Sequence, residues 1–251
     1  MACANVGVVA VAGGKSDWLA HLGLPLFHQR RRCPSASADA SAEDQGYRSR
    51  VHPSDGLKVR ICQTVSSTEA EGPGRRFAIW VQGCPIRCVG CCNPAMLAEN
   101  GGIEVEVKDL VRQIHSTEDI EGITFVGGEP FAQPDAVAEI CRECQTHGLS
   151  VMVFTGFTLD ELEGRSNPAI QLALDHTDLL VDGPFVQGQV EQRRRWIGSA
   201  NQGLHFLSDR YQPLDPVFWA DNTVEIRFDG REISVNGWPL QSMGGNKGKL
   251  V

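Results

Sequence analysis

Strand-like and helix-like stretches alternate along the chain from Leu57 onward, and this alternation constrains the fold more than any other feature. Apolar, β-branched stretches predict strands at residues 57–65, 77–82, 123–126, 149–154 and 179–181. Apolar residues at helical spacing predict helices at residues 107–115, 134–147, 159–163 and 168–175. Such alternation indicates parallel βα units, which carry their functional sites at the carboxyl ends of the strands. We therefore expect an α/β fold.

The pattern divides the 251 residues into three parts. Residues 1–56 are expected to form a poorly ordered extension, partly absent from the native protein, because the folded pattern begins abruptly at Leu57. Residues 57–205 are expected to form the main folded domain. Residues 206–251 are expected to hold a small β-hairpin, with strands at 223–228 and 232–235 around Asp229-Gly230, and a flexible tail at 243–251.

Charge and cysteine content narrow the class of protein. The net charge of −8 argues against nucleic-acid binding, which needs a basic surface. No apolar run approaches the roughly 18 residues of a membrane helix, so no membrane span is expected. The nine cysteines are odd in number, and four of them lie between positions 84 and 92. That clustering indicates metal binding or catalysis in a reducing compartment, so we expect a cytoplasmic protein.

The cysteine cluster follows a predicted strand directly. Cys84, Cys88 and Cys91 form a CxxxCxxC loop in which Gly83, Pro85 and Gly90 favour a tight bend. Thiolates suit soft metals and iron–sulfur clusters. Three of them could ligate three irons of a four-iron cluster and leave the fourth iron open to another ligand. Cys92 stands beside this set without an assigned role.

Two motifs together resemble those of the radical S-adenosylmethionine (SAM) superfamily: the CxxxCxxC loop and, after the next predicted strand, Gly127-Gly128-Glu129-Pro130. The chain is more closely similar to the small activating enzymes of anaerobic ribonucleotide reductase and pyruvate formate-lyase. Further segments match in order at residues 80–84, 93–94, 154–157, 178–185 and 198–202, so the resemblance covers about residues 57–205.

The resemblance implies a partial (βα) barrel of the radical SAM type, in which Cys84, Cys88 and Cys91 ligate a single [4Fe-4S] cluster. It implies that SAM binds the open iron, with Glu129 near the methionyl amine. Cofactor contacts are expected from Gly127, Gly128, Glu129, Pro130, Thr155 and Asp182. Reductive cleavage of SAM would yield a radical that removes hydrogen from a partner. The implied partners are a glycyl radical enzyme as substrate and flavodoxin or ferredoxin as reductant.

Each feature also has a plainer interpretation. The three cysteines could form a structural zinc site, although zinc needs four ligands and Cys92 is awkwardly placed as the fourth. Cys141 and Cys144 form a second CxxC, but their helical spacing favours a place in the buried face of a helix. Glu129 could be an ordinary carboxylate at a strand end, and Gly127-Gly128 a simple turn.

Two neighbouring segments are also open to more than one interpretation. The basic run at 193–195 is interpreted as a solvated loop rather than a phosphate or partner contact. The loop at 196–202 could cover SAM or meet the partner. Two alternatives to an activating enzyme remain: a radical SAM enzyme that modifies a peptide or small molecule, and a non-enzymatic iron–sulfur electron carrier.

Overall fold

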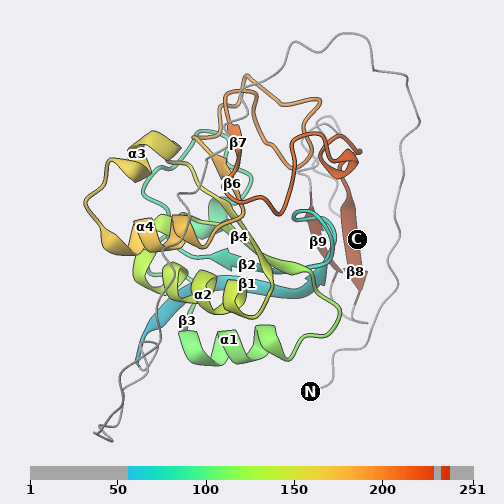
Figure 1. Ribbon diagram of the computed structural model, residues 1–251. Helices are drawn as coiled ribbons and strands as arrows, with labels where there is room; N and C mark the ends of the chain where they lie inside the picture. Colours follow the sequence, from blue (N-terminus) through green and yellow to red (C-terminus); the bar gives the residue numbers. More distant parts are fainter. Residues whose placement is uncertain (1–55, 229–232, 238–251) are drawn as a thin grey trace, which may run out of the picture.

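A seven-stranded sheet forms the centre of the computed structural model, which describes residues 56–228 and 233–237 (Figure 1). The strand order is β3-β1-β2-β4-β5-β6-β7, and the inner strands β2, β4, β5 and β6 run parallel. The sheet stays open, with β3 and β7 as its edges. The strands are β1 (Lys58–Thr68), β2 (Arg76–Val81), β3 (Ile103–Glu106), β4 (Gly122–Gly127), β5 (Ser150–Phe154), β6 (Leu179–Asp182) and β7 (Gly203–Phe206).

The helices follow the predicted alternation closely. They are α1 (Val107–His115), α2 (Pro134–Thr146), α3 (Leu159–Glu163) and α4 (Pro168–Asp175), with 3-10 turns η1 (Pro94–Met96), η2 (Pro130–Ala132) and η3 (Pro216–Phe218). A separate hairpin pairs β8 (Val224–Phe228) with β9 (Ile233–Gly237). The prediction of an α/β fold with a partial barrel and a C-terminal hairpin is confirmed.

Local sequence explains where the helices begin. Proline occupies the first turn of both α2 and α4, where its missing N–H costs nothing. Thr158 and Glu161 form a reciprocal capping box at the start of α3. In α2, Cys141 and Cys144 are fully buried, so the prediction that this second CxxC fills a helix core is confirmed.

The two faces of the sheet differ in what covers them, and successive side chains of β2 point to opposite faces. Phe77, Ile79 and Val81 pack on the face covered by α1, α2 and α4. Ala78 and Trp80 point to the opposite face, where they pack with Val126 of β4. Within residues 56–228 and 233–237, no helix longer than a 3-10 turn contributes to the clusters on this second face, which leaves its strand ends available for a site.

The edge strands β3 and β7 were not predicted, because an alternation of apolar and polar residues over only four positions is too short to stand out. The predicted domain boundary after residue 205 falls within β7, and Phe206 and Phe218 pack beside Met152 and Leu179 of the central sheet. The predicted extension up to residue 55, the turn at Asp229-Gly230 and the tail at 243–251 lie outside the described residues. None of the described helices is long and apolar enough to span a bilayer.

Candidate functional site

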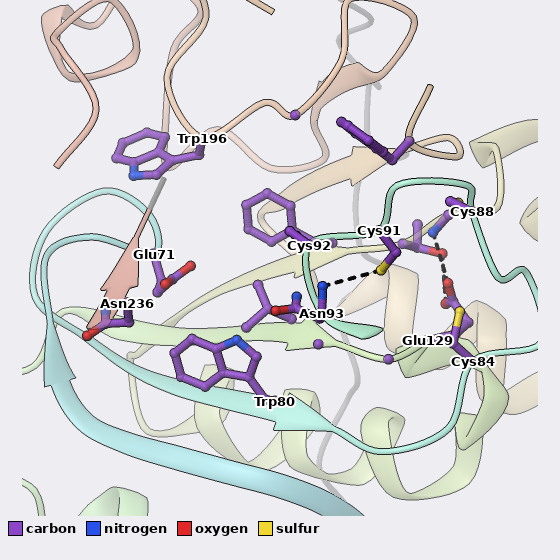
Figure 2. A pocket seen from close by; sticks show the side chains of 18 of the residues that line it. Glu71, Trp80, Cys84, Cys88, Cys91, Cys92, Asn93, Glu129, Trp196 and Asn236 are labelled. Carbon is purple, nitrogen blue, oxygen red and sulfur yellow. Dashed lines mark hydrogen bonds between the residues drawn. The ribbon is translucent and has the colours of Figure 1, made fainter. Parts of the chain in front are cut away.

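A cavity of about 390 Å³ lies on the face of the sheet opposite the helices (Figure 2). It begins at the carboxyl ends of β2, β4 and β5 and extends to the C-terminal hairpin. Aromatic and aliphatic side chains supply much of its wall, including Trp80, Val126, Phe154 and Phe185. A mostly apolar cavity with a few convergent polar groups is the usual form of a cofactor or substrate site.

The three predicted cluster cysteines all line this cavity. Gly83, with φ of +92°, turns the chain at the end of β2 so that Cys84 follows at the cavity wall. The loop then closes on itself, since the Cys91 amide donates to the Cys88 carbonyl at 3.2 Å and the Asn93 amide donates to Cys91 Sγ at 3.4 Å. Cys84 is buried, whereas Cys88 and Cys91 are partly exposed.

Cys92 acquires a physical role that the sequence did not provide. Its thiol is hydrogen-bonded to Cys91, which lowers the pKa of Cys91 and raises that of Cys92. Burial raises the pKa of Cys88. Cys92 therefore favours the thiolate form of its neighbour, the form that binds metal.

The donor set fits an iron–sulfur cluster, because three thiols of one short loop face one cavity. Among residues 56–228 and 233–237, no three His, Cys, Asp or Glu side chains converge closely enough to hold a single metal ion. A four-iron cluster does not require such convergence, since each thiolate binds a different iron. The zinc alternative gains no support from this part of the chain.

The segment Gly127–Glu129 lies directly against the start of the cysteine loop. The Gly128 amide donates to the Val81 carbonyl and the Glu129 amide donates to the Gly83 carbonyl, both at 2.8 Å. A Cβ atom on Gly128 would lie only 2.4 Å from the Gly83 carbonyl oxygen. The two glycines therefore permit a backbone approach that no other residue allows, which a simple turn would not require.

The Glu129 carboxylate joins the ends of β4 and β5. It accepts hydrogen bonds from the Phe131 amide at 2.9 Å, from Thr155 Oγ1 at 2.8 Å and from the Gly156 amide at 2.8 Å. Its side chain is almost fully buried, and burial raises its pKa to about 7 against the effect of these donors. Glu129 is therefore a buried carboxylate and not one that a strand end exposes to solvent.

The remaining predicted cofactor contacts differ in their placement. Thr155 lines the cavity, whereas Pro130 and Asp182 are not among its lining residues. Asp182 accepts from the Leu159 amide at 2.6 Å and the Gly203 amide at 3.0 Å, and it pairs with His205 at 2.9 Å. These contacts hold the end of β6, and a cofactor contact at either residue stays a prediction.

The basic run is less solvated than the sequence indicated. Arg193 is exposed, but Arg194 Nε donates to Glu191 at 2.6 Å and its Nη1 donates to the Gln202 carbonyl at 2.6 Å. The interpretation of the whole run as a solvated loop is therefore wrong. Arg194 anchors the following loop, from which Trp196, Gly198 and Gln202 reach the cavity.

Other lining residues escaped sequence analysis altogether. Glu71 comes from the β1–β2 connection, and Val235, Asn236 and Gly237 come from β9. No motif marks these positions, and the two segments meet only through the fold, as in the hydrogen bond from the Gly237 amide to Glu71 Oε1 at 2.8 Å across 166 positions. Local sequence patterns carry no signal for such a contact.

Comparison with known proteins gives consistent matches over the region that holds this site. A family described as a 4Fe-4S single cluster domain matches residues 70–205. The anaerobic ribonucleoside-triphosphate reductase-activating protein of Salmonella typhimurium is 35% identical over 144 residues, which cover 54% of this chain and 91% of that protein. Its Escherichia coli K12 counterpart is 32% identical over 145 residues, with the same coverage of 54% and 91%.

A second kind of activating enzyme also matches. Pyruvate formate-lyase 1-activating enzyme of Escherichia coli K12 is 33% identical over 128 residues, which cover 49% of this chain and 50% of that enzyme.

Proposed function

Because the chain belongs to the family of anaerobic ribonucleoside-triphosphate reductase-activating proteins, we propose that it activates a glycyl radical enzyme with a [4Fe-4S] cluster and SAM. Membership confirms the resemblance inferred from the CxxxCxxC and Gly127–Pro130 segments, and the single-cluster domain confirms the expected kind of cluster. One observation carries the proposal: the three cysteines and the two glycines line one cavity, and the Glu129 amide donates to the Gly83 carbonyl, directly before the cysteine loop.

Each part of the site has a task in this function. Cys84, Cys88 and Cys91 would hold the cluster, and Cys92 would keep Cys91 in its thiolate form. When bound, the cluster and SAM supply one-electron chemistry that removes a hydrogen atom from the substrate. The chain itself supplies position and exclusion of water.

The backbone at Gly127–Glu129 would hold the bound cofactor in position, because its hydrogen bonds fix it to the start of the cysteine loop. Trp80, Phe154 and Phe185 form apolar walls that keep water from a reactive intermediate. A purely electron-carrying protein has no need of such a cavity beside its cluster, so the cavity favours an enzyme over that alternative. The hairpin residues at the far end leave room for the other alternative, a different peptide or small molecule as substrate.

The electron donor and the compartment follow from the same chemistry. We propose flavodoxin or ferredoxin as the reductant, since the cluster needs single electrons. All seven cysteines in the described part of the chain are free, which favours the reducing cytoplasm.

The proposal is tested by anaerobic reconstitution of the full chain with iron and sulfide, followed by dithionite and SAM. We expect release of 5′-deoxyadenosine and, with the anaerobic ribonucleoside-triphosphate reductase of Escherichia coli, a glycyl radical signal in electron paramagnetic resonance. Cys84→Ala should lose both signals, whereas Cys62→Ala should keep them, because Cys62 is not among the residues that line the cavity. A fully loaded cluster without SAM cleavage would refute an enzymatic function.

A further inference from the structure

The cavity has a second end, away from the side where the cluster cysteine Cys84 lies. Figure 2 shows Cys84, Cys88 and Glu129 together at one side, while Glu71, Trp196 and Asn236 gather at the other. This second end joins the β1–β2 connection, β9 and the loop at 196–202, three segments far apart in sequence.

Trp196 is held rigidly, in an unusual backbone conformation. Its φ is +65°, in the left-handed region that bulky side chains rarely adopt. The Arg195 guanidinium stacks over its ring at 4.4 Å, and the Phe218 ring meets it edge-on at 5.9 Å. The Trp196 amide donates to Asn222 Oδ1 at 2.8 Å. These contacts compensate for the strain and fix the indole in the cavity wall.

Among the described residues, none accepts a hydrogen bond from the indole N–H of Trp196. The side chain is only 7% exposed, and Nε1 has no hydrogen-bond partner in the part of the chain that the structure describes. The ring turns its nitrogen toward the side of the cavity where Glu71 lies (Figure 2). A buried donor left unpaired costs free energy, so a fixed one in a cavity wall indicates an acceptor on the ligand.

Glu71 supplies the complementary acceptor. Its carboxylate is held by the Gly237 amide at 2.8 Å and by the Asn236 side chain, both from β9. Burial raises its pKa to about 7. Trp80 forms an aromatic wall beside it. The second end thus offers one fixed donor and one fixed acceptor on largely apolar walls.

This pair selects a ligand by chemistry. A cation would suit Glu71 but leave the indole N–H unpaired, and an anion would suit the indole but be repelled by Glu71. A neutral peptide unit satisfies both, because its C=O accepts and its N–H donates. A glycine peptide fits most easily, since no side chain keeps its backbone from the walls.

We propose that Trp196 and Glu71 form a subsite for the backbone of the substrate's glycine-bearing segment. Trp196 Nε1 donates to a substrate carbonyl, and Glu71 accepts from a substrate amide. The inference rests on the proposed function and deepens it, because it identifies which part of the cavity recognises the polypeptide. Both residues are positioning residues, since they bind beside the reacting carbon.

The test measures KM values of the reconstituted full-length protein, with the anaerobic ribonucleoside-triphosphate reductase of Escherichia coli as the probe and glycyl radical formation as the signal. Trp196→Phe keeps the ring and removes the donor, and Glu71→Met keeps the length of the side chain and removes the acceptor. Each should raise KM for the reductase about tenfold, the value of about one hydrogen bond, and change KM for SAM less than twofold.

Matched controls use residues outside the cavity. Trp219→Phe removes an indole whose Nε1 donates to the Pro213 carbonyl at 3.0 Å, and Glu69→Met removes an exposed carboxylate two positions from Glu71. Neither should alter KM for the reductase.

The outcomes separate the two proposals. A wild-type protein that cleaves SAM but forms no glycyl radical overturns the proposed function. If the wild-type protein is active and both cavity variants keep the wild-type KM for the reductase, only the subsite is refuted. A rise in KM for SAM equal to that for the reductase would assign the pair to the cofactor and overturn the subsite as well. Because Glu71→Met does not depend on the strained backbone at Trp196, it remains informative if Trp196→Phe fails to fold.

Discussion

Replacing Gly128 by alanine tests whether the close approach of two backbone segments builds the site. A Cβ atom there would lie 2.4 Å from the Gly83 carbonyl oxygen and 3.0 Å from that of Val81. Ordinary contact begins at 3.4 Å, so the strand end must move by about 3.4 − 2.4 = 1.0 Å. Both backbone hydrogen bonds of 2.8 Å, from the amides of Gly128 and Glu129, would be stretched.

The magnitude follows from these contacts. Overpacking costs about 1–3 kcal/mol, and weakening two hydrogen bonds adds about 1 kcal/mol. We therefore expect Gly128→Ala to lower the free energy of unfolding by about 2–4 kcal/mol. The larger effect should be on activity, because a displacement of about 1 Å at a reacting centre can reduce the rate about 100-fold.

The assay combines urea unfolding with the rate of 5′-deoxyadenosine release from the reconstituted protein. Gly188→Ala is the matched control, since a Cβ atom at Gly188 meets nothing within 4 Å and its φ is not left-handed. This control should stay within about 0.5 kcal/mol of the wild-type protein. The reasoning fails if Gly128→Ala unfolds and cleaves SAM like Gly188→Ala, because the backbone approach would then be dispensable.

Three further predictions test other parts of the molecule. Cys88→Ala should abolish cluster loading, measured as bound iron. Cys141→Ala in the buried face of α2 should keep the cluster and lose about 1–2 kcal/mol of stability. Equal iron loss in both variants would contradict the division of the cysteines into cluster ligands and helix core. Arg76→Met should lower the free energy of unfolding in urea by about 3–5 kcal/mol, because this fully buried guanidinium donates to the Thr124 and Ser150 side chains at 2.7 and 2.8 Å. The control Arg112→Met, at an exposed position, should lower it by less than about 0.5 kcal/mol. Burial raises the pKa of Glu71 from 4.5 to about 7, so the folded protein holds this proton more tightly than the unfolded chain and stability falls as pH rises through that range. Between about pH 5 and pH 8 the wild-type protein should lose about 2 kcal/mol more than Glu71→Gln in urea unfolding, and equal losses would show that Glu71 is not buried as described.

Local patterns predicted the regular core well. Helix α1 spans residues 107–115 as expected, because Val107, Leu110, Val111 and Ile114 place one apolar stripe on a single helix face. The inner strands were also predictable, since β2 is buried on both faces and is apolar from Phe77 to Val81. The edge strands β3 and β7 escaped because they are short and pair along only one side.

The candidate site, like the fold, was predictable only in part. The cysteine loop and Gly127–Glu129 were recognisable because each sits within a few residues of a strand end, and neighbouring parallel strands end at the same edge of the sheet. The sequence did not predict which of these side chains would form hydrogen bonds or ion pairs with the protein itself. Asp182 also follows a strand end, yet its carboxylate is committed to Leu159, Gly203 and His205.

The sequence by itself determined the ligand chemistry, the αβ alternation and the family, because thiol spacing, apolar periodicity and glycine placement are local properties of the chain. Only the tertiary structure decided what faces the cluster cysteines across the cavity. Glu71 and Trp196 belong to segments separated by more than a hundred residues, and they line one cavity because the β1–β2 connection, the loop after Arg195 and β9 pack on the same face of the sheet. Such a meeting depends on how distant segments pack and on which way each side chain turns, which no local pattern specifies.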